Sequence, residues 1–399
     1  MINPTSIQNI LTLRYDPTQY PLLPKLTNVD YTSNEKPSSE KVESLLLKAV
    51  NDQTDNKSPE KISIALSGGV DSTLILKLIH QLFPKTEINA ISIRFSESVD
   101  ETKSAAVIAD KFNANHHIVH LENYLNELPK AISIVGMPFW DLHWYHVAKK
   151  AQTISRYLAS GDGGDEIFGG YTFRYKKFLS LTTENSTPQD KVMVYLKCHE
   201  RDWVPDQEKI FTNKIHFNWE DIYRLLIPYF DNKLSRLDQV LLADYNGKLL
   251  YNFSIINTSI NRFFNIKSVT PLLSQEIIQY VTKISNQFKY DTKNDVGKLL
   301  LRELTKKYNL DSVLTTEKLG FNVNTINLWK NYGQRLCKYY LLDSRIIKDG
   351  WINFEWINHH INEKDLNVWY VNKFLGLLSF EIWYRLFVTK EIDSNTKLE

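Results

Sequence analysis

Hydrophobic and polar residues follow two different patterns along this chain. Between residues 61 and 160, short apolar runs typical of buried strands alternate with segments whose apolar residues recur every three or four positions, the spacing of a helix. The pattern predicts strands over residues 61–66, 88–95, 116–121 and 156–160, and helices over residues 73–83, 102–112, 124–135 and 144–153. This alternation predicts an α/β fold, a parallel sheet with helices on both faces.

The patterns on either side of this region are different. Residues 1–42 contain several prolines and little helical period, so we expect a leader segment that lies on the body or stays mobile. After Tyr171 the strand patterns fade and helical ones follow. We therefore expect one domain over residues 43–399, with an α/β core over 43–180 and a largely helical part over 181–399 that completes the site.

Composition and charge exclude several classes of protein. The chain has 399 residues, of which 43% are apolar and 24% charged, a balance typical of a folded protein. Lys and Arg number 48 against 46 Asp and Glu, which argues against a general nucleic-acid or membrane surface. No apolar run approaches the ~20 residues of a membrane span, and no signal-peptide pattern is present, so a cytoplasmic location is expected. Two cysteines exclude a disulfide framework and a Cys-rich zinc site.

The first motif with chemical meaning is a glycine-rich turn between a predicted strand and a predicted helix. It consists of Ser67, Gly68, Gly69, Val70, Asp71 and Ser72. Paired glycines let the backbone approach a ligand closely, and successive N–H groups at a helix N-terminus favour a phosphate. Asp71 fits a phosphate site only beside a cation, for which Mg²⁺ is the natural choice. The simpler interpretation is a tight capped turn; the nucleotide-binding GxxxxGK[ST] pattern does not occur.

A second turn, Gly161-Asp162-Gly163-Gly164-Asp165-Glu166, follows the predicted strand 156–160. Three carboxylates this close repel one another unless a cation neutralises them. Both turns should lie at the carboxyl edge of the sheet, where ligands bind in parallel α/β folds. A dinucleotide GxGxxG is excluded because Glu166 stands where the last glycine would be. A solvated acidic loop is the simpler interpretation of this turn alone.

Together the two motifs resemble a known family. SGGVDS followed by SGDGGDEIFGGY (160–171) is similar to the synthetase domain of the asparagine synthetase family, a PP-loop ATP pyrophosphatase. Four further segments resemble that family in the same order: SVDETKSAAVIADKFNANHHIV (98–119), GKLLLRE (297–303), TEKLGFNV (316–323) and LLSFEIWYRLF (377–387). The resemblance runs from about residue 40 to residue 390.

This resemblance implies an ATP-dependent carbon–nitrogen ligase. ATP would activate a small carboxylic acid as an acyl-adenylate with release of pyrophosphate, and an amine would then displace AMP, as in asparagine biosynthesis. By motif match, Asp71 and Asp165 correspond to the family's Mg²⁺ carboxylates and Lys298 to its phosphate-contacting lysine. The remaining matches are the ATP- and pyrophosphate-binding candidates Ser67, Gly68, Gly69, Val70, Ser72, Gly161, Arg302 and Lys318, and the substrate-binding candidates Asp141, Asp162, Gly163 and Glu166.

The sequence departs from the family in two places. Glutamine-using members carry an N-terminal glutaminase domain that begins with a cysteine, whereas here only a short segment precedes SGGVDS and Ile2 stands second. We therefore expect free ammonia, another amine, or a separate glutaminase subunit as the nitrogen source. The family segment Glu-Pro-x-x-Asp reads Met137-Pro138-Phe139-Trp140-Asp141 here, so its glutamate is missing. Asp141, His143 or His146 would then have to take over its handling of protons.

Several alternatives stay open at this point. The aromatic residues Phe139, Trp140, Trp144 and Tyr145 are core or wall a pocket for an acid larger or more apolar than aspartate. The basic and aromatic segment 172–178 is a solvated helix face or a contact for a phosphate-bearing or nucleic-acid substrate. A PP-loop enzyme that modifies tRNA and an inactive nucleotide-binding subunit are further candidates. The oligomeric state is open, with a homodimer among the options.

Overall fold

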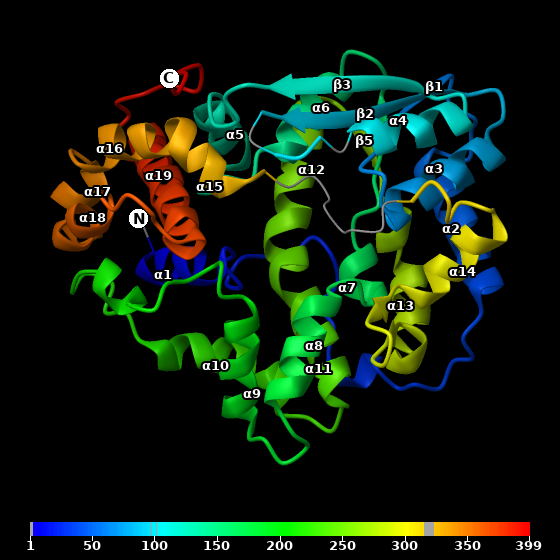
Figure 1. The fold of residues 1–399 in the computed structure, drawn as a ribbon, viewed down its shortest axis with the longest axis horizontal. Coiled ribbons are helices and arrows are strands. Elements are labelled where there is room, and N and C mark those ends of the chain that lie inside the picture. Colours follow the sequence, from blue (N-terminus) through cyan, green and yellow to red (C-terminus); the bar gives the residue numbers. More distant parts are fainter. Residues whose placement is uncertain (1–2, 97, 101, 315–322) are drawn as a thin grey trace.

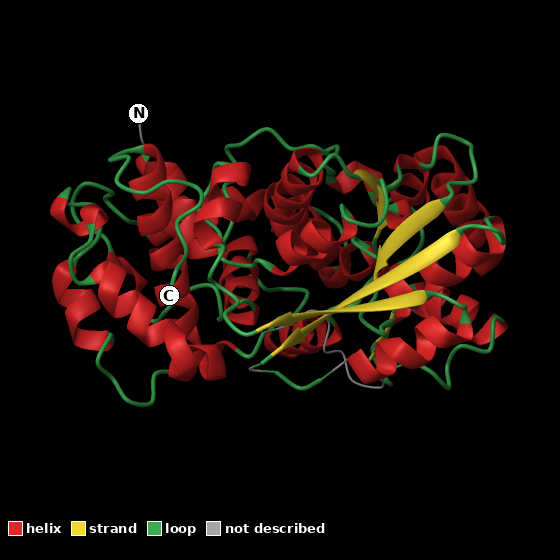
Figure 2. Ribbon diagram, turned by 90° about the horizontal axis from the view of Figure 1, so that it is seen from above, coloured by secondary structure: helices red, strands yellow, loops and turns green. Residues whose placement is uncertain are grey.

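A parallel five-stranded sheet stands at the centre of the architecture, in the order β3-β2-β1-β4-β5. This computed structural model describes residues 3–96, 98–100, 102–314 and 323–399. The strands are β1 (Lys61–Ala65), β2 (Glu87–Phe95), β3 (Asn115–Leu121), β4 (Tyr157–Ala159) and β5 (Lys267–Val269). The pairing of Ile64 with Ala159 brings the carboxyl ends of β1 and β4 to one edge of the sheet. Figure 2 shows the strands as a twisted fan with helices above and below.

Helices cover both faces of this sheet, as the alternating pattern predicts. The helices of this part are α2 (Ser39–Gln53), α3 (Val70–Leu82), α4 (Thr102–Lys111), α5 (Leu128–Val135) and α6 (His143–Ala151). One core contains Ile64 and Leu74, and a second contains Ile91 and Trp144 from the other side of the sheet. The α/β fold class that the sequence predicted is confirmed.

The second half is largely helical, which is also as predicted. Short α7 (Gly164–Phe168) leads into it, and further helices follow in the middle, lower and outer parts of Figure 1. They are α8 (Thr172–Leu181), α9 (Pro188–Cys198), α10 (Trp219–Phe230), α11 (Arg236–Asp244), α12 (Ser254–Phe263), α13 (Gln275–Thr282), α14 (Leu299–Lys307), α15 (Thr325–Leu328), α16 (Gln334–Leu341), α17 (Arg345–Lys348), α18 (Phe354–His360) and α19 (Val368–Phe387). A π-helical segment, Tyr245–Phe253, joins α11 to α12.

The expectation of little helix in the N-terminal segment is wrong for α1 (Pro4–Leu13). Pro4 occupies the start of this helix, where its missing N–H is no loss, and Asn3 caps the helix by accepting the N–H of Thr5 at 3.0 Å. Ile7 and Leu11 are buried, and α1 packs near α19. This segment is therefore part of the packed body.

The sheet also contains a strand that the sequence did not predict. β5 comes from the helical half and pairs in parallel with β4, Ala159 lying opposite Val269. Its residues Lys267 and Ser268 are polar and half-buried, so the strand has no apolar run to reveal it. A small antiparallel hairpin, β6 (Tyr290–Asp291) with β7 (Val296–Gly297), was also missed.

Two further expectations concern membranes and helix capping. Across the described ranges, no helix has both the length and the hydropathy that a bilayer crossing would require. Ser98 stands three residues before Glu101, which predicts a capping box at the start of the helix over residues 102–112, but Glu101 lies outside the described residues.

Candidate active site

The first turn leaves β1 and enters α3 at the carboxyl edge of the sheet. Gly68 has a φ of +79°, a left-handed conformation that favours glycine, and Gly69 is the N-cap of α3. Ser67 and Ser72 share a hydrogen bond between their hydroxyl oxygens at 3.3 Å, which closes the turn. Asp71 lies in the first turn of the helix, where backbone N–H groups lack helical partners. The local sequence thus builds an anion-binding helix N-terminus with a carboxylate beside it.

The second turn leaves β4 and packs directly against Asp71. A Cβ on Gly161 would lie 2.6 Å from the Cβ of Asp71, and one on Gly164 would lie 2.5 Å from its Cγ. Gly163, the N-cap of α7, has a φ of +90° and a tight contact with Leu273. These glycines are required because two chain segments approach within van der Waals contact here.

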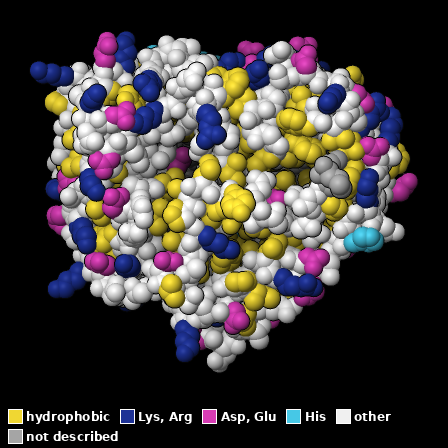
Figure 3. Space-filling model, turned by 180° about the vertical axis from the view of Figure 1, so that it is seen from behind, with side chains coloured by type: hydrophobic (Ala, Val, Ile, Leu, Met, Phe, Trp, Pro, Cys, Tyr) yellow, Lys and Arg dark blue, Asp and Glu magenta, His cyan; other side chains and the backbone are white. Residues whose placement is uncertain are grey.

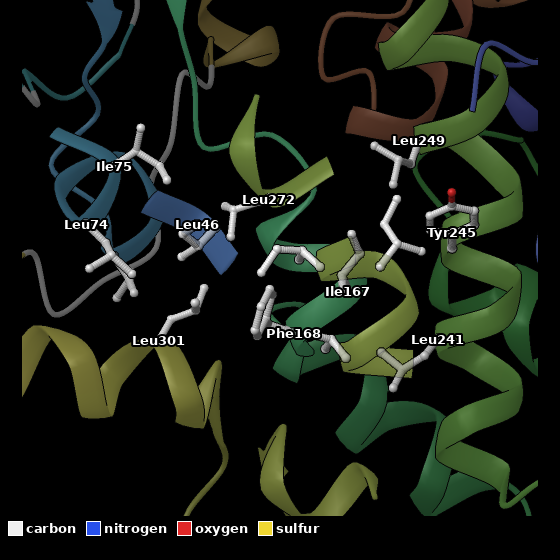
Figure 4. Packing of buried hydrophobic residues seen from close by; sticks show 14 of the residues in the cluster. Leu46, Leu74, Ile75, Ile167, Phe168, Leu241, Tyr245, Leu249, Leu272 and Leu301 are labelled. Atoms are coloured by element: carbon white, nitrogen blue, oxygen red, sulfur yellow. The ribbon is translucent and has the colours of Figure 1, made fainter. Parts of the chain in front are cut away.

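The apolar residues of α7 fix this turn in the core. Ile167 and Phe168 lie between residues of the α2–α3 side, such as Leu46, and those of the α11 side, such as Leu241 (Figure 4). Phe168 is fully buried, and its carbonyl accepts the N–H of Lys298 at 3.1 Å. The core therefore ties the second turn to the segment that carries Lys298.

Lys298 joins both turns. Its ammonium lies 2.8 Å from Oδ1 of Asp165 and forms an ion pair with Asp71 as well. Its backbone is left-handed, with a φ of +58°, a conformation uncommon for a residue with a side chain. Gly170 leaves room for the cluster, because a Cβ there would overlap Oδ1 of Asp165 and Cε of Lys298.

The electrostatics of this cluster keep the lysine charged. The side chains of Lys298, Asp71 and Asp165 are 10%, 16% and 21% exposed. Burial alone would lower the pKa of Lys298, but the carboxylates of Asp165 and Asp71 outweigh it and raise that pKa above its usual value. One ammonium thus neutralises part of the charge of two carboxylates.

The same carboxylates fit a divalent cation. Mg²⁺ prefers carboxylate oxygens, and Asp71 and Asp165 present two such groups to one point from neighbouring strands. These two residues are therefore the ones that would hold the ion.

The other two cationic candidates from the sequence are Arg302 and Lys318. The Nε of Arg302 donates to the carbonyl of Gly297 at 3.0 Å, so this exposed side chain braces the backbone just before Lys298. Lys318 and most of the segment resembling Lys-x-Gly-Phe lie outside the described residues.

The substrate-binding candidates are spread around the second turn. Oδ2 of Asp162 accepts from the amide of Asn257 at 2.9 Å, and burial raises the pKa of this carboxyl. Glu166 accepts from the hydroxyl of Tyr171 at 2.5 Å. Asp141 forms an ion pair with Arg14, which the sequence analysis did not single out.

The position of the family's missing glutamate is occupied by a buried methionine, Met137, which is 5% exposed. Of its suggested substitutes, His146 is packed, with Nε2 3.4 Å from the carbonyl of Tyr124, and burial lowers its pKa to about 4. Burial also lowers the pKa of His143, opposed by the nearby carboxylates of Asp141 and Asp162. His143 therefore lies between two substrate-binding candidates, whereas His146 is a neutral core residue.

Two cavities are lined by candidate residues. One, which we call the Tyr171 cavity, borders the second turn, includes Glu166, Tyr171 and Arg174 in its wall, and leaves about 30 Å³ for the centre of a water-sized molecule. The other, which we call the Trp140 cavity, includes Arg14, Trp140 and Asp141 and leaves a similar space of about 30 Å³. Asp202 lines both.

Sequence reasoning missed most residues of these cavities. Arg14 stacks over Trp140 at 4.5 Å and lies 3.7 Å from Asp202. Arg174, in the segment 172–178 for which a solvated helix face was one interpretation, has a side chain only 14% exposed and lies 3.4 Å from Asp244. The exposed Phe173 fits the solvated interpretation, but Arg174 contradicts it because the residue points inward. No local signal separates it from the neighbouring lysines.

The molecular surface agrees with the near balance of charge. Figure 3 shows Lys and Arg interspersed with Asp and Glu over this face, with hydrophobic side chains gathered across its middle. That face presents no extended field of one sign.

Fold and site together define an α/β protein whose ligand site lies at the carboxyl ends of parallel strands. The chain belongs to the asparagine synthase family, whose model matches residues 41–385. The family predicted from the motifs is thereby confirmed.

Individual relatives cover different parts of the chain. It is 26% identical over 363 residues to asparagine synthetase [glutamine-hydrolyzing] 1 of Bacillus subtilis, covering 82% of this chain and 56% of the relative. It is 26% identical over 247 residues to NH(3)-dependent NAD(+) synthetase of Wolinella succinogenes, covering 54% of this chain and 88% of the relative. The chain thus spans about half the length of the Bacillus relative.

Among solved structures, NH3-dependent NAD synthetase from Campylobacter jejuni aligns with a TM-score of 0.26 and 14% identity. This alignment covers 34% of this chain and 62% of the other. A likeness that slight carries no argument about this site.

Proposed function

We propose that this chain adenylates a small carboxylic acid with ATP and transfers the acyl group to an amine, forming an amide, AMP and pyrophosphate. The observation that carries this proposal is the convergence of Asp71 and Asp165, from the ends of neighbouring strands, on Lys298. A helix N-terminus suited to phosphate lies directly beside them.

Each group has a role in the first step. An oxygen of the acid attacks the α-phosphorus, the bond to the bridging oxygen breaks, and pyrophosphate leaves with the electron pair. The N–H groups of the first turn, with Ser67 and Ser72, hold the pyrophosphate portion. The ammonium of Lys298 stabilises the negative charge that develops on the phosphate, and it is fixed in place beforehand by the two carboxylates.

Mg²⁺ held by Asp71 and Asp165 would neutralise the charge of the triphosphate and orient its leaving group. The two residues are already turned toward a shared cation, so this role needs little rearrangement of the chain.

In the second step an amine attacks the acyl carbon, the carbon–oxygen bond to AMP breaks, and the nitrogen loses a proton. We propose that this chain takes ammonia or another amine directly. Burial raises the pKa of Cys198 to about 11 and that of Cys337 above its usual value, so neither thiol suits a nucleophile for glutamine. The name of the Wolinella relative, which specifies NH3, supports the same choice.

A second candidate concerns the acid. The Trp140 cavity has Phe139 and Trp140 in its wall, and the neighbouring Met137 stands where the family has a glutamate. These residues favour an acid with a more apolar body than aspartate. The chemistry of the adenylation step is the same for either acid.

ATP–pyrophosphate exchange by the full chain, with a panel of acids that includes aspartate and aromatic or branched acids, tests the proposal. Exchange with one acid establishes adenylation and names the carboxylate. Absence of exchange with every acid and with RNA would reject the enzyme and favour an inactive nucleotide-binding subunit, whereas exchange with RNA alone would favour the tRNA-modifying alternative.

Two additions sharpen that test. Asp165→Asn should abolish Mg²⁺-dependent exchange while the chain still folds, whereas undiminished exchange would contradict its metal role. Amide formation should proceed with ammonium and fail with glutamine when the pure chain is used.

A further inference from the structure

The Tyr171 cavity lies next to the carboxylate pair but contains none of the groups assigned to ATP. Glu166 and Tyr171 connect it to the second turn, since Glu166 directly follows Asp165 and Tyr171 follows the glycine pair that ends the motif. Its other walls come from α1, α8, α9, α11 and the π-helical segment. A ligand here would lie beside the reacting groups.

The most unusual group in this wall is Asp244, at the end of α11. The residue is 4% exposed. Its Oδ1 accepts from the hydroxyl of Tyr195 at 2.9 Å and lies 3.4 Å from Arg174 and 3.5 Å from Nε2 of His199. Its Oδ2 is buried and has no hydrogen-bond partner within the described part of the chain. A buried carboxylate oxygen without a donor costs free energy, so this site calls for a donor group.

The charge state of these groups favours a cation over a neutral donor. Burial opposes ionisation of Asp244, but Arg174, His199 and Tyr195 outweigh it and lower the pKa of the carboxyl. Burial lowers the pKa of His199, which leaves this ring neutral near pH 7. Among the described lining residues, Arg174 is the cation that pairs with Asp244.

Another carboxylate of the cavity wall, Asp202, already has cationic partners. Asp202 forms an ion pair with Lys248 at 2.5 Å and with Arg14 at 3.7 Å, the latter approaching from the Trp140 cavity. An anionic ligand in this cavity would be repelled by the carboxylates of Asp244 and Glu166 in its wall.

Aromatic rings complete the surroundings of Asp244. Tyr15, Tyr171, Tyr195 and Trp203 line the cavity, and Arg174 already stacks over the ring of Tyr171 at 3.5 Å. Ring faces attract cations, so a small cation gains from these walls as well as from the carboxylates.

We propose that the Tyr171 cavity binds the amine substrate as its ammonium ion, with Oδ2 of Asp244 accepting one of its N–H groups. This inference rests on the proposed function, because it gives that function its nitrogen site. Free ammonium and a short primary amine share the required chemistry, a small cation with several N–H donors. The placement next to Glu166 would hold the amine beside the second turn.

Crystals of the full chain soaked in rubidium chloride test the site without requiring activity. Rubidium resembles ammonium in charge and size and is visible by its anomalous scattering. We expect an anomalous peak next to Asp244 that decreases when ammonium chloride or methylammonium chloride is added. A cavity that contains only water, or a peak that neither salt displaces, would overturn the proposal.

Kinetics with Asp244→Asn provide the second test. The apparent KM for ammonium should rise about tenfold, the effect of losing a charged hydrogen-bond partner, while ATP–pyrophosphate exchange stays unchanged. Asp238→Asn is the matched control, because Asp238 is also buried on α11 but bonds to Ser235 and Asn286 away from the cavity. An unchanged KM in Asp244→Asn would reject the ammonium site, whereas absent exchange in the unaltered chain would instead reject the adenylating function.

Comparing the effect of Asp244→Asn on the KM for ammonium and for primary amines shows which of them this site binds. A KM effect of Asp244→Asn with ammonium alone assigns the site to free ammonia. An equal effect with methylammonium or ethylammonium assigns it to primary amines in general.

Discussion

The strand-end turns and the Arg14 region both hold carboxylates against cations, but the chain builds them in different ways. At the turns, Asp71 and Asp165 each belong to a continuous glycine-rich motif whose backbone fixes the carboxylate. Around Arg14, the partners Asp141 and Asp202 come from separate loops, and no motif surrounds them. The first region is positioned by local geometry and the second by the packing of α1 and α19.

This difference has consequences for what a substitution does. In the turns, backbone segments contact one another directly, so even one added methyl group must displace a chain segment or a charged side chain. In the Arg14 region, the charged side chains of Arg14 and Asp141 line a cavity and are 23% and 26% exposed, so they can rearrange more easily than the packed turns. Substitutions should therefore be more severe at the turns than around the cavities.

Lys298→Met should have the largest effect. It removes the ammonium shared by Asp71 and Asp165, so exchange should be abolished and the free energy of unfolding lowered by about 3 kcal/mol, as for a buried pair that loses one partner. Urea unfolding with and without Mg²⁺ measures this. The metal should stabilise the variant more than the unaltered chain, because the two carboxylates are then without their cation.

Lys306→Met is the control for this prediction. Lys306 lies exposed in the last turn of the same helix, α14, and its loss should change the free energy of unfolding by less than about 1 kcal/mol. Equal stability of Lys298→Met and Lys306→Met would show that the ion pairs at the turns carry no stability.

Gly170→Ala should come next. A Cβ at this position would lie 2.9 Å from Cα of Asp165 and overlap the groups that form its ion pair with Lys298, so we expect exchange to fall about a hundredfold. The rate of exchange at saturating ATP checks this.

Gly350→Ala is the control for this prediction, because it strains the backbone without displacing any residue of the site. Its φ is +70° and an added Cβ would meet nothing within 4 Å, so it should cost about 1 kcal/mol of stability and leave exchange intact. If Gly170→Ala behaved like Gly350→Ala, the close packing of the second turn would be unimportant for the reaction.

The smallest effect is expected for the pair of Arg14 and Asp141. A double-mutant cycle with Arg14→Met and Asp141→Asn should give a coupling energy of about 1 kcal/mol, because both side chains are about a quarter exposed, at 23% and 26%. Urea unfolding of the four proteins measures it. A coupling of zero would mean that the pair of Arg14 and Asp141 adds nothing to stability, and a coupling as large as the loss in Lys298→Met would remove the contrast between the two regions.

The sequence predicts features that depend on neighbouring residues better than features that depend on contacts between distant residues. The strands β1 to β4 and the helices between them follow from short-range apolar patterns, and both glycine-rich turns lie where those patterns place them. β5 was not predicted because two of its residues are polar. Helix α1 was not predicted because Pro4 suggests a helix break, although proline also fits the first position of a helix. The division into a leader and one domain, and the chemical roles of the site residues, stay predictions.

The candidate site divides in the same way. Asp71 and Asp165 were found by their motifs, and Lys298 by the family resemblance, whereas Asp244 and Arg174 had no signal. Asp244 is one carboxylate among many, and only the packing of α8, α9 and α11 shows that its Oδ2 lies buried.

The sequence by itself determined the parallel α/β core, the two turns at its carboxyl edge and the family to which the chain belongs, because each depends on residues adjacent in the chain. The tertiary structure decided which distant charges meet: Lys298 with Asp71, 227 positions apart, and Arg14 with Asp141, 127 positions apart. The reason is physical. Backbone preferences and apolar periodicity act over a few residues, but the meeting of two side chains depends on how whole helices pack, and that is set by the complete core.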